Sequence, residues 1–161
     1  MPIEMRIKGL VVDPLSKMPI IILEDLRSER VLPIWIGVFE ANAIALTMEN
    51  VPTPRPMTHD LMKNLLSRLG IAVERIVVTD VRNNTFYAAI HCRRGDDAVV
   101  FDSRPSDAIA LALRTGSPIF VEDDVVRKSH GLKSDEAPDT LENMRKWLES
   151  ISPDVLGKYK M

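Results

Sequence analysis

The chain has 161 residues, of which 45% are hydrophobic and 27% charged, and its formal net charge at pH 7 is −2. This hydrophobic fraction argues against intrinsic disorder, and the length suits one domain that buries about 70% of its unfolded surface. The balanced charge excludes the overall basicity of a protein that coats nucleic-acid duplexes, although it leaves room for a local basic patch.

The cysteine content and the chain start bear on the cellular compartment. The single cysteine, Cys92, excludes an intrachain disulfide and a CxxC zinc site, and it fits a reducing environment. The opening residues 1–6 are not followed by the long apolar segment of a signal peptide, and no run approaches 18 apolar residues. We therefore expect a cytoplasmic protein that does not span a membrane.

The first third of the chain predicts an antiparallel meander of three strands and then a helix. Short apolar runs separated by turn residues place the strands at residues 5–12, 19–23 and 31–36. After the break at Gly37, residues 39–48 are rich in alanine and apolar on most sides, which predicts a buried helix.

A proline-rich connection, residues 50–56, leads to a second helix. Three prolines in five residues make this connection stiff and extended. Thr58 is expected to cap a helix that runs to Leu69. Large apolar side chains recur along it at helical spacing and predict a core face. This face consists of Leu61, Met62, Leu65, Leu66 and Leu69.

The middle of the chain predicts a second antiparallel meander. Its strands are expected at residues 71–81, 85–92 and 98–101. Asn83 and Asn84 favour a tight hairpin turn between the first two strands, because Asn tolerates a positive φ.

The stretch from Val99 to Gly116 is the one around which the chain is organised. It begins as a β-branched run that suits a strand and ends as an alanine- and leucine-rich run that suits a helix. Pro105 fits the first helical turn, and Gly116 fits the left-handed position just past the last turn. The corner between them concentrates polar side chains where the free N–H groups of a helix start favour an anion. These are Asp102, Ser103, Arg104, Ser106 and Asp107.

We expect one compact α+β domain over residues 1–128, with an antiparallel or mixed sheet built from the two meanders and about three core helices. A short strand at 118–121 and a helical turn at 123–128 complete this domain. Residues 129–138 are polar and predict a linker, and residues 139–161 predict a C-terminal helix and tail.

Three segments of this sequence carry a resemblance to a known family. Leu32–Ala41, Arg55–Leu61 and Asp102–Leu111 occur in the order and spacing that resemble the bifunctional nuclease domain family, and Thr85–Ala88 fits between them. The resemblance covers about residues 5–125 of the chain. It implies a compact α+β fold that self-associates, and the family's name implies hydrolysis of DNA and RNA. The resemblance does not supply an agreed set of catalytic residues for this sequence.

The matched segments contain the side chains that phosphodiester hydrolysis requires. Such hydrolysis uses a divalent cation held by carboxylates, an activated water and cations that stabilise the developing charge. Asp102, Asp107, Asp60 and Glu40 could hold Mg²⁺ or Mn²⁺ through oxygen, and the three aspartates are the predicted metal ligands. His59 is the candidate general base, because its unperturbed pKa lies near neutrality.

Basic and polar side chains of the same segments are the candidates for substrate binding. Arg104 and Arg55 offer forked donors to a phosphate, Lys63 could extend a groove for the backbone, and Ser106 lies at the same corner.

Each candidate also has a structural interpretation. The aspartates at the helix starts could simply interact with the helix dipole. His59 and Asp60 could form a local hydrogen-bonded pair. Arg104 could pair internally with Asp102 or Glu40 and thereby fix the corner.

Two functions follow from the sequence. The first is a metal-assisted nuclease acting on DNA or RNA. The second is a non-enzymatic, homo-oligomeric binding module that recognises an anionic ligand or a protein partner. The negative net charge and an aromatic content of only 5% favour the second, whereas the resemblance favours the first. The expected partners are a second or third copy of the chain and DNA or RNA.

Overall fold

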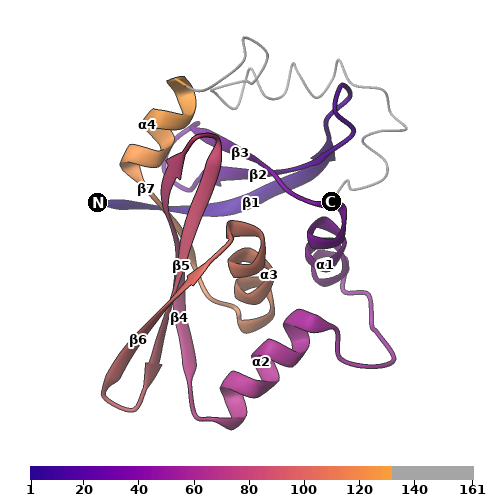
Figure 1. Cartoon of the computed structure of the whole chain (residues 1–161), viewed down its shortest axis with the longest axis vertical. Coiled ribbons are helices and arrows are strands. Elements are labelled where there is room, and N and C mark those ends of the chain that lie inside the picture. The colour runs from indigo at the N-terminus through magenta and orange to yellow at the C-terminus, as the bar shows by residue number, and fades with distance from the viewer. Residues whose placement is uncertain (132–161) are drawn as a thin grey trace.

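The computed structural model describes residues 1–131, which form a seven-stranded sheet and four helices (Figure 1). The strands are β1 (Pro2–Val12), β2 (Pro19–Asp25), β3 (Val31–Trp35), β4 (Ala72–Arg82), β5 (Thr85–Arg94), β6 (Asp97–Ser103) and β7 (Ile119–Glu122). The helices are α1 (Val38–Met48), α2 (Thr58–Arg68), α3 (Pro105–Thr115) and α4 (Asp123–Gly131). The predicted α+β class is thus confirmed.

The C-terminal part of the domain differs slightly from the expected boundaries. Helix α4 continues to Gly131, three residues beyond the expected helical turn and into the segment predicted as a linker. Residues 132–138 of that linker and the predicted helix at 139–161 lie outside the described residues. None of the helices in residues 1–131 has the length and apolar character needed to cross a membrane.

The sheet contains both predicted meanders, joined by a strand from the end of the domain. The strand order is β3-β2-β1-β7-β4-β5-β6. Strand β7 pairs antiparallel with β1, where Met5 faces Ile119, and parallel with β4, where Ile76 faces the same Ile119. This short strand makes one mixed sheet out of two antiparallel halves.

The predicted turn residues have the expected positive φ angles, but the predicted cap of the second helix is a different residue. Asn83 and Asn84 have positive φ angles of 49° and 62° in the β4–β5 turn, and Gly116 takes the left-handed position after α3 at a φ of 67°. The prediction for Thr58 is wrong, because Met57 is the N-cap residue and Thr58 begins α2. The Asp60 carboxylate accepts the backbone N–H of Met57 at 2.9 Å and satisfies the helix start in place of a hydroxyl.

Helix α3 is the element on which helices α1 and α2 pack. It contacts α1 and α2 on one side and strands β4 and β5 on the other, and Figure 1 shows it between them. Its side chains from Ala108 to Ala112 are almost fully buried. The alternation of alanine with Ile109 and Leu111 lets neighbouring elements approach closely while the larger side chains fill the core.

Helix α2 does not have the buried core face that its periodicity predicts. Leu61, Leu65 and Leu69 are each more than half exposed, and Met62 and Leu66 are only partly buried. The reason is that α2 packs mainly against α3 and not against the sheet. Its apolar stripe therefore has only a partial covering within residues 1–131.

Helix α1 is also less buried than its composition predicts. Ala41 and Ile44 are buried in the core, but Val38 is half exposed and the Phe39 side chain is 88% exposed. Although α1 is apolar on most sides, only one of its faces packs in the core, and another face is exposed.

The buried strands predict how core substitutions will act on stability. Leu23 is fully buried in β2, whereas Leu15 is exposed in the turn before it. We expect Leu23→Ala to lower the free energy of unfolding by about 2–5 kcal/mol, because it removes apolar contacts and leaves a cavity. The identical change Leu15→Ala should alter it by less than about 0.5 kcal/mol. Urea unfolding followed by circular dichroism measures both, and equal losses would contradict the observed packing.

Candidate functional site

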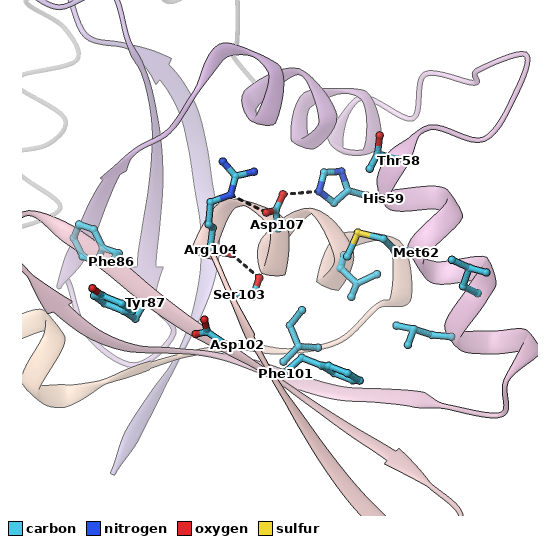
Figure 2. A pocket seen from close by; sticks show the side chains of 14 residues that line it. Thr58, His59, Met62, Phe86, Tyr87, Phe101, Asp102, Ser103, Arg104 and Asp107 are labelled. Carbon is cyan, nitrogen blue, oxygen red and sulfur yellow. Dashed lines mark hydrogen bonds and ion pairs between the residues drawn. The ribbon is translucent and has the colours of Figure 1, made fainter.

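The N-terminal turns of α1, α2 and α3 meet at one point, and hydrogen-bonded ionisable side chains join them. Arg104, the N-cap residue of α3, donates from Nη1 to Oε1 of Glu40 and from Nε to Oδ2 of Asp107, both at 2.9 Å. Nε2 of His59 lies 2.9 Å from Oδ1 of Asp107 (Figure 2). We call these four residues, Glu40, His59, Arg104 and Asp107, the Arg104 cluster.

The local sequence explains how Glu40 reaches this cluster. Glu40 is the third residue of α1, and its carboxylate turns back over the N-cap residue Gly37. A Cβ atom on residue 37 would collide with Oε2 of Glu40, so the carboxylate occupies space that only glycine leaves open. Gly37 thus permits the Glu40 carboxylate to lie over the helix start and to bond Arg104.

The cluster keeps its charged groups ionised. Burial raises the pKa of Asp107, but the hydrogen bonds from Arg104 and His59 more than offset this effect, so the pKa is lowered. The pKa of Glu40 is lowered by a hydrogen bond from its own backbone N–H and by Arg104. Two carboxylates therefore face one guanidinium at neutral pH, and the cluster carries an excess of negative charge whenever the imidazole is neutral.

A cleft of about 850 Å³ opens beside the cluster, between α2 and strands β5 and β6. His59, Arg104 and Asp107 form part of its polar end, together with Thr58 (Figure 2). The remaining wall is largely apolar and is made by Met62, Leu65, Leu66, Phe86, Tyr87, Ile90, Phe101 and Leu111, with Asp102 and Ser103 at its edge. A mainly apolar hollow with a few convergent polar groups is typical of a ligand-binding site.

A second ion pair holds α2 in place and faces away from this cleft. Arg114 of α3, whose side chain is only 5% exposed, donates from Nε to Oδ1 of Asp60 at 2.8 Å. Its other donors bond the carbonyl oxygens of Ala43 in α1 and Ala110 in α3, each at 2.9 Å. The pKa of Asp60 is lowered, chiefly by the Met57 N–H and also by Arg114. This buried guanidinium thus links all three helices.

The sequence prediction that the three matched segments converge is partly realised. Glu40, His59, Arg104 and Asp107 come together as one network. The alternative in which His59 pairs with its neighbour Asp60 is not formed, because Asp60 bonds Arg114 on the other side of α2. The internal pairing of Arg104 with Glu40 is formed.

The other predicted site residues lie apart from the cluster. Asp102 is exposed at the edge of the cleft, and Figure 2 shows it separated from His59 and Asp107. Ser106 is buried in the first turn of α3, and Arg55 is exposed in the proline-rich connection. Lys63 is exposed on α2 and lines a smaller hollow together with Asp60.

The predicted metal ligands are not gathered into one site. Within residues 1–131, no group of three or more His, Cys, Asp or Glu side chains is placed to hold a metal ion. Asp60 is bound to Arg114, and Asp107 is bound to Arg104 and His59. Asp102 stands apart from Asp107 (Figure 2). The donor set therefore does not fit the expected three-aspartate cation site, and we derive no chemical step through a metal.

Two functional features escape the sequence reasoning. Arg114 is not among the predicted site residues, although a single cation in the last turn of an alanine-rich helix is a usable signal. The cleft wall contributed by Phe86, Tyr87 and Phe101 leaves no such signal, because aromatic residues are ordinary in the strands of any sheet.

The lowered pKa of Asp107 predicts how stability depends on pH. A carboxylate with a lowered folded-state pKa stabilises the fold above its unfolded pKa of about 3.9, and this contribution is lost as the pH falls through the folded-state value. Asp107→Asn should therefore be less stable than the wild type at pH 7, and the difference should shrink between about pH 5 and pH 2. Melting temperatures followed across this range test the prediction.

A matched control for that experiment is Asp102→Asn. Asp102 forms no hydrogen bond or ion pair through its side chain with other residues of the described domain. We expect its melting curve to follow the wild type at every pH. If Asp107→Asn also ran parallel to the wild type, the ion pairs around Asp107 would not contribute to folding.

Comparison with known proteins identifies the family. The profile of the bifunctional nuclease domain matches residues 21–133, well over half of the chain. An uncharacterized protein of Mycobacterium tuberculosis is 38% identical over 160 residues, which cover 94% of this chain and 96% of that protein. Bifunctional nuclease 2 of Arabidopsis thaliana is 33% identical over 93 residues, which cover 56% of this chain and 28% of that protein. Bifunctional nuclease 1 of Oryza sativa subsp. indica is 28% identical over 102 residues, which cover 62% of this chain and 30% of that protein. The chain thus matches less than a third of each of these two plant nucleases. It belongs to the bifunctional nuclease domain family.

Proposed function

We propose that this chain hydrolyses phosphodiester bonds in DNA or RNA, with the reaction at the polar end of the cleft. The family link and the names of the plant relatives support the class of reaction. The observation that carries the assignment to this end of the cleft is the pairing of His59 with Asp107 at 2.9 Å. An imidazole oriented by a carboxylate is a recurring arrangement for general acid–base chemistry.

His59 has one nitrogen available for that role. A carboxylate only accepts hydrogen bonds, so Nε2 carries the hydrogen toward Asp107 and Nδ1 of a neutral ring is left as the base. The side chain is 9% exposed and lines the cleft. The proposed role of Nδ1 is to accept the proton of a water molecule whose oxygen attacks phosphorus. The P–O bond to one of the two ester oxygens breaks as the new bond forms, and the leaving alkoxide takes a proton from solvent.

Arg104 is the proposed phosphate contact. Its side chain is 63% exposed, and among the described residues its Nε and Nη1 groups have partners whereas Nη2 has none. A guanidinium fixed on two sides presents its remaining donor in a set direction, which suits a phosphate oxygen. The carboxylates of Glu40 and Asp107 already offset the positive charge of Arg104 and weaken its attraction for an anion. The proposed contact therefore orients a phosphate more than it attracts one.

Cleavage of labelled single-stranded DNA and RNA by the full chain tests this proposal. We expect His59→Ala to lower the cleavage rate by about 100-fold or more, because a positioned acid–base group contributes factors of that size. His91→Ala is the matched control, because His91 lies on β5 and does not line the cleft. It should leave the rate unchanged.

Metal dependence stays a prediction that the same assay addresses. Each reaction is run with Mg²⁺, with Mn²⁺ and with a chelator, and melting temperatures confirm that the variants are folded. Cleavage that survives in His59→Ala would contradict the proposed role of His59. Absence of cleavage by the wild-type chain with every metal would overturn the nuclease proposal.

We also propose that the chain self-associates through the exposed apolar side chains of α1 and α2. Phe39 at 88% exposure supports this most directly, and Leu61 of α2 and Leu69, the C-cap residue of that helix, add exposed apolar area. Large apolar side chains left in water at several neighbouring elements mark interaction surfaces, because their burial against a partner is favourable.

The molar mass in solution tests this second proposal. Light scattering coupled to size exclusion should give a dimer or trimer for the wild type, and Phe39→Asp should shift the mass to that of one chain. Asn42→Asp introduces the same charge at another exposed position of α1 and should leave the mass unchanged. A wild-type mass of 18.1 kDa would refute self-association.

A further inference from the structure

We propose that the cleft seats an unpaired nucleobase against Phe101, so that the chain selects single-stranded nucleic acid over duplex. This inference rests on the proposed function and adds the class of substrate. It starts from the wall of the cleft formed by β6, where Phe101 lines the same hollow as Met62 and Leu65 of α2.

The cleft gathers aromatic side chains that the composition makes scarce. Aromatic residues are only 5% of the chain, yet Phe86, Tyr87 and Phe101 all line this one hollow. Proteins that bind single strands use such rings as platforms on which bases stack, because every base has a flat π-face. Figure 2 shows Phe86 and Tyr87 apart from Phe101, so a base that stacks on Phe101 uses that ring alone.

Phe101 is the ring that remains available. The guanidinium of Arg82 lies 4.7 Å from the centroid of Tyr87 and covers one of its faces. Phe86 is partly buried, whereas Phe101 is 42% exposed on an edge strand, with Ile90 as its neighbour across the sheet. A flat apolar ligand that enters the cleft would therefore be placed between Phe101 and the α2 side chains (Figure 2).

The charges of the cleft favour contacts to bases over contacts to the backbone. General binding to duplex depends on cations that neutralise phosphates. The charged side chains that line this cleft include one arginine, Arg104, and two aspartates, Asp102 and Asp107. Arg104 also donates a hydrogen bond to Glu40, whose negative charge further offsets the charge of the guanidinium. Affinity must then come largely from apolar burial of bases. In a duplex the faces of the bases are stacked on one another and cannot contact Phe101, whereas the face of an unpaired base is accessible.

Fluorescence anisotropy with the full chain provides the test. The probes are a labelled 20-nucleotide single strand with uncleavable phosphorothioate linkages and the duplex of the same sequence. We expect the single strand to bind at least tenfold more tightly than the duplex. Phe101→Ala should weaken single-strand binding by about tenfold, the size expected when one stacked base loses its platform.

Val100→Ala is the matched control, because Val100 precedes Phe101 on β6, points to the other side of the strand and is 56% exposed. It should bind like the wild type. Phe101→Trp keeps a flat ring and should retain binding, and the fluorescence of the new tryptophan should be quenched by the single strand.

Several outcomes would overturn the inference. Equal affinities for single strand and duplex, or equal effects of Phe101→Ala and Val100→Ala, would do so while leaving cleavage through His59 intact. Loss of the oligomer in Phe101→Ala, with unchanged single-strand binding, would show that a second copy covers this ring. Failure of both probes to bind would also overturn it, and the cleavage assay would then decide the proposed function separately.

Discussion

Two arginines at the two ends of α3 fix the positions of α1 and α2. Arg104 at the start of α3 bonds Glu40 of α1 and reaches His59 of α2 through Asp107, and Arg114 at its end bonds Asp60 of α2 and a carbonyl of α1. The two contributions differ in kind. Arg104 is 63% exposed, so its ion pairs add little stability and mainly fix direction. Arg114 is buried, and removing one partner would leave an uncompensated charge in the interior.

The parts of the fold that sequence reasoning recovers are those set by local chemistry. Both meanders, the Asn83–Asn84 turn and the ends of α3 follow from alternation, positive φ and the proline–glycine asymmetry of helices. The insertion of β7 between the two meanders does not follow, because pairing Ile119 with residues of β1 and β4 depends on contacts across most of the chain. Periodicity likewise identifies the apolar stripe of α2 but does not tell what covers it.

The candidate site shows the same division at the scale of single residues. The convergence of three segments is predictable, but the partner of each carboxylate is not. His59 and Asp60 are adjacent in sequence and lie about 100° apart around the helix, so one enters the cleft and the other bonds Arg114. Asp102 lies on a strand just before the corner, and it therefore stays at the edge while Asp107 enters the network. The type of residue at a helix start thus limits which interactions are possible, but it does not determine which partner each carboxylate binds.

The exposed leucines of α2 are a consequence of the cleft itself. A helix that forms one wall of an open hollow cannot also lie flat on the sheet that forms the other wall, so Leu65 lines the cleft and Leu61 and Leu69 remain exposed. Such a helix loses the apolar burial that usually holds a helix in place, because most helical stability comes from packing of an apolar face. The Asp60–Arg114 pair and the His59–Asp107 bond supply directed contacts to α3 instead. The same bond that orients the imidazole thus also keeps the cleft wall in position, and any change to Asp107 acts on both.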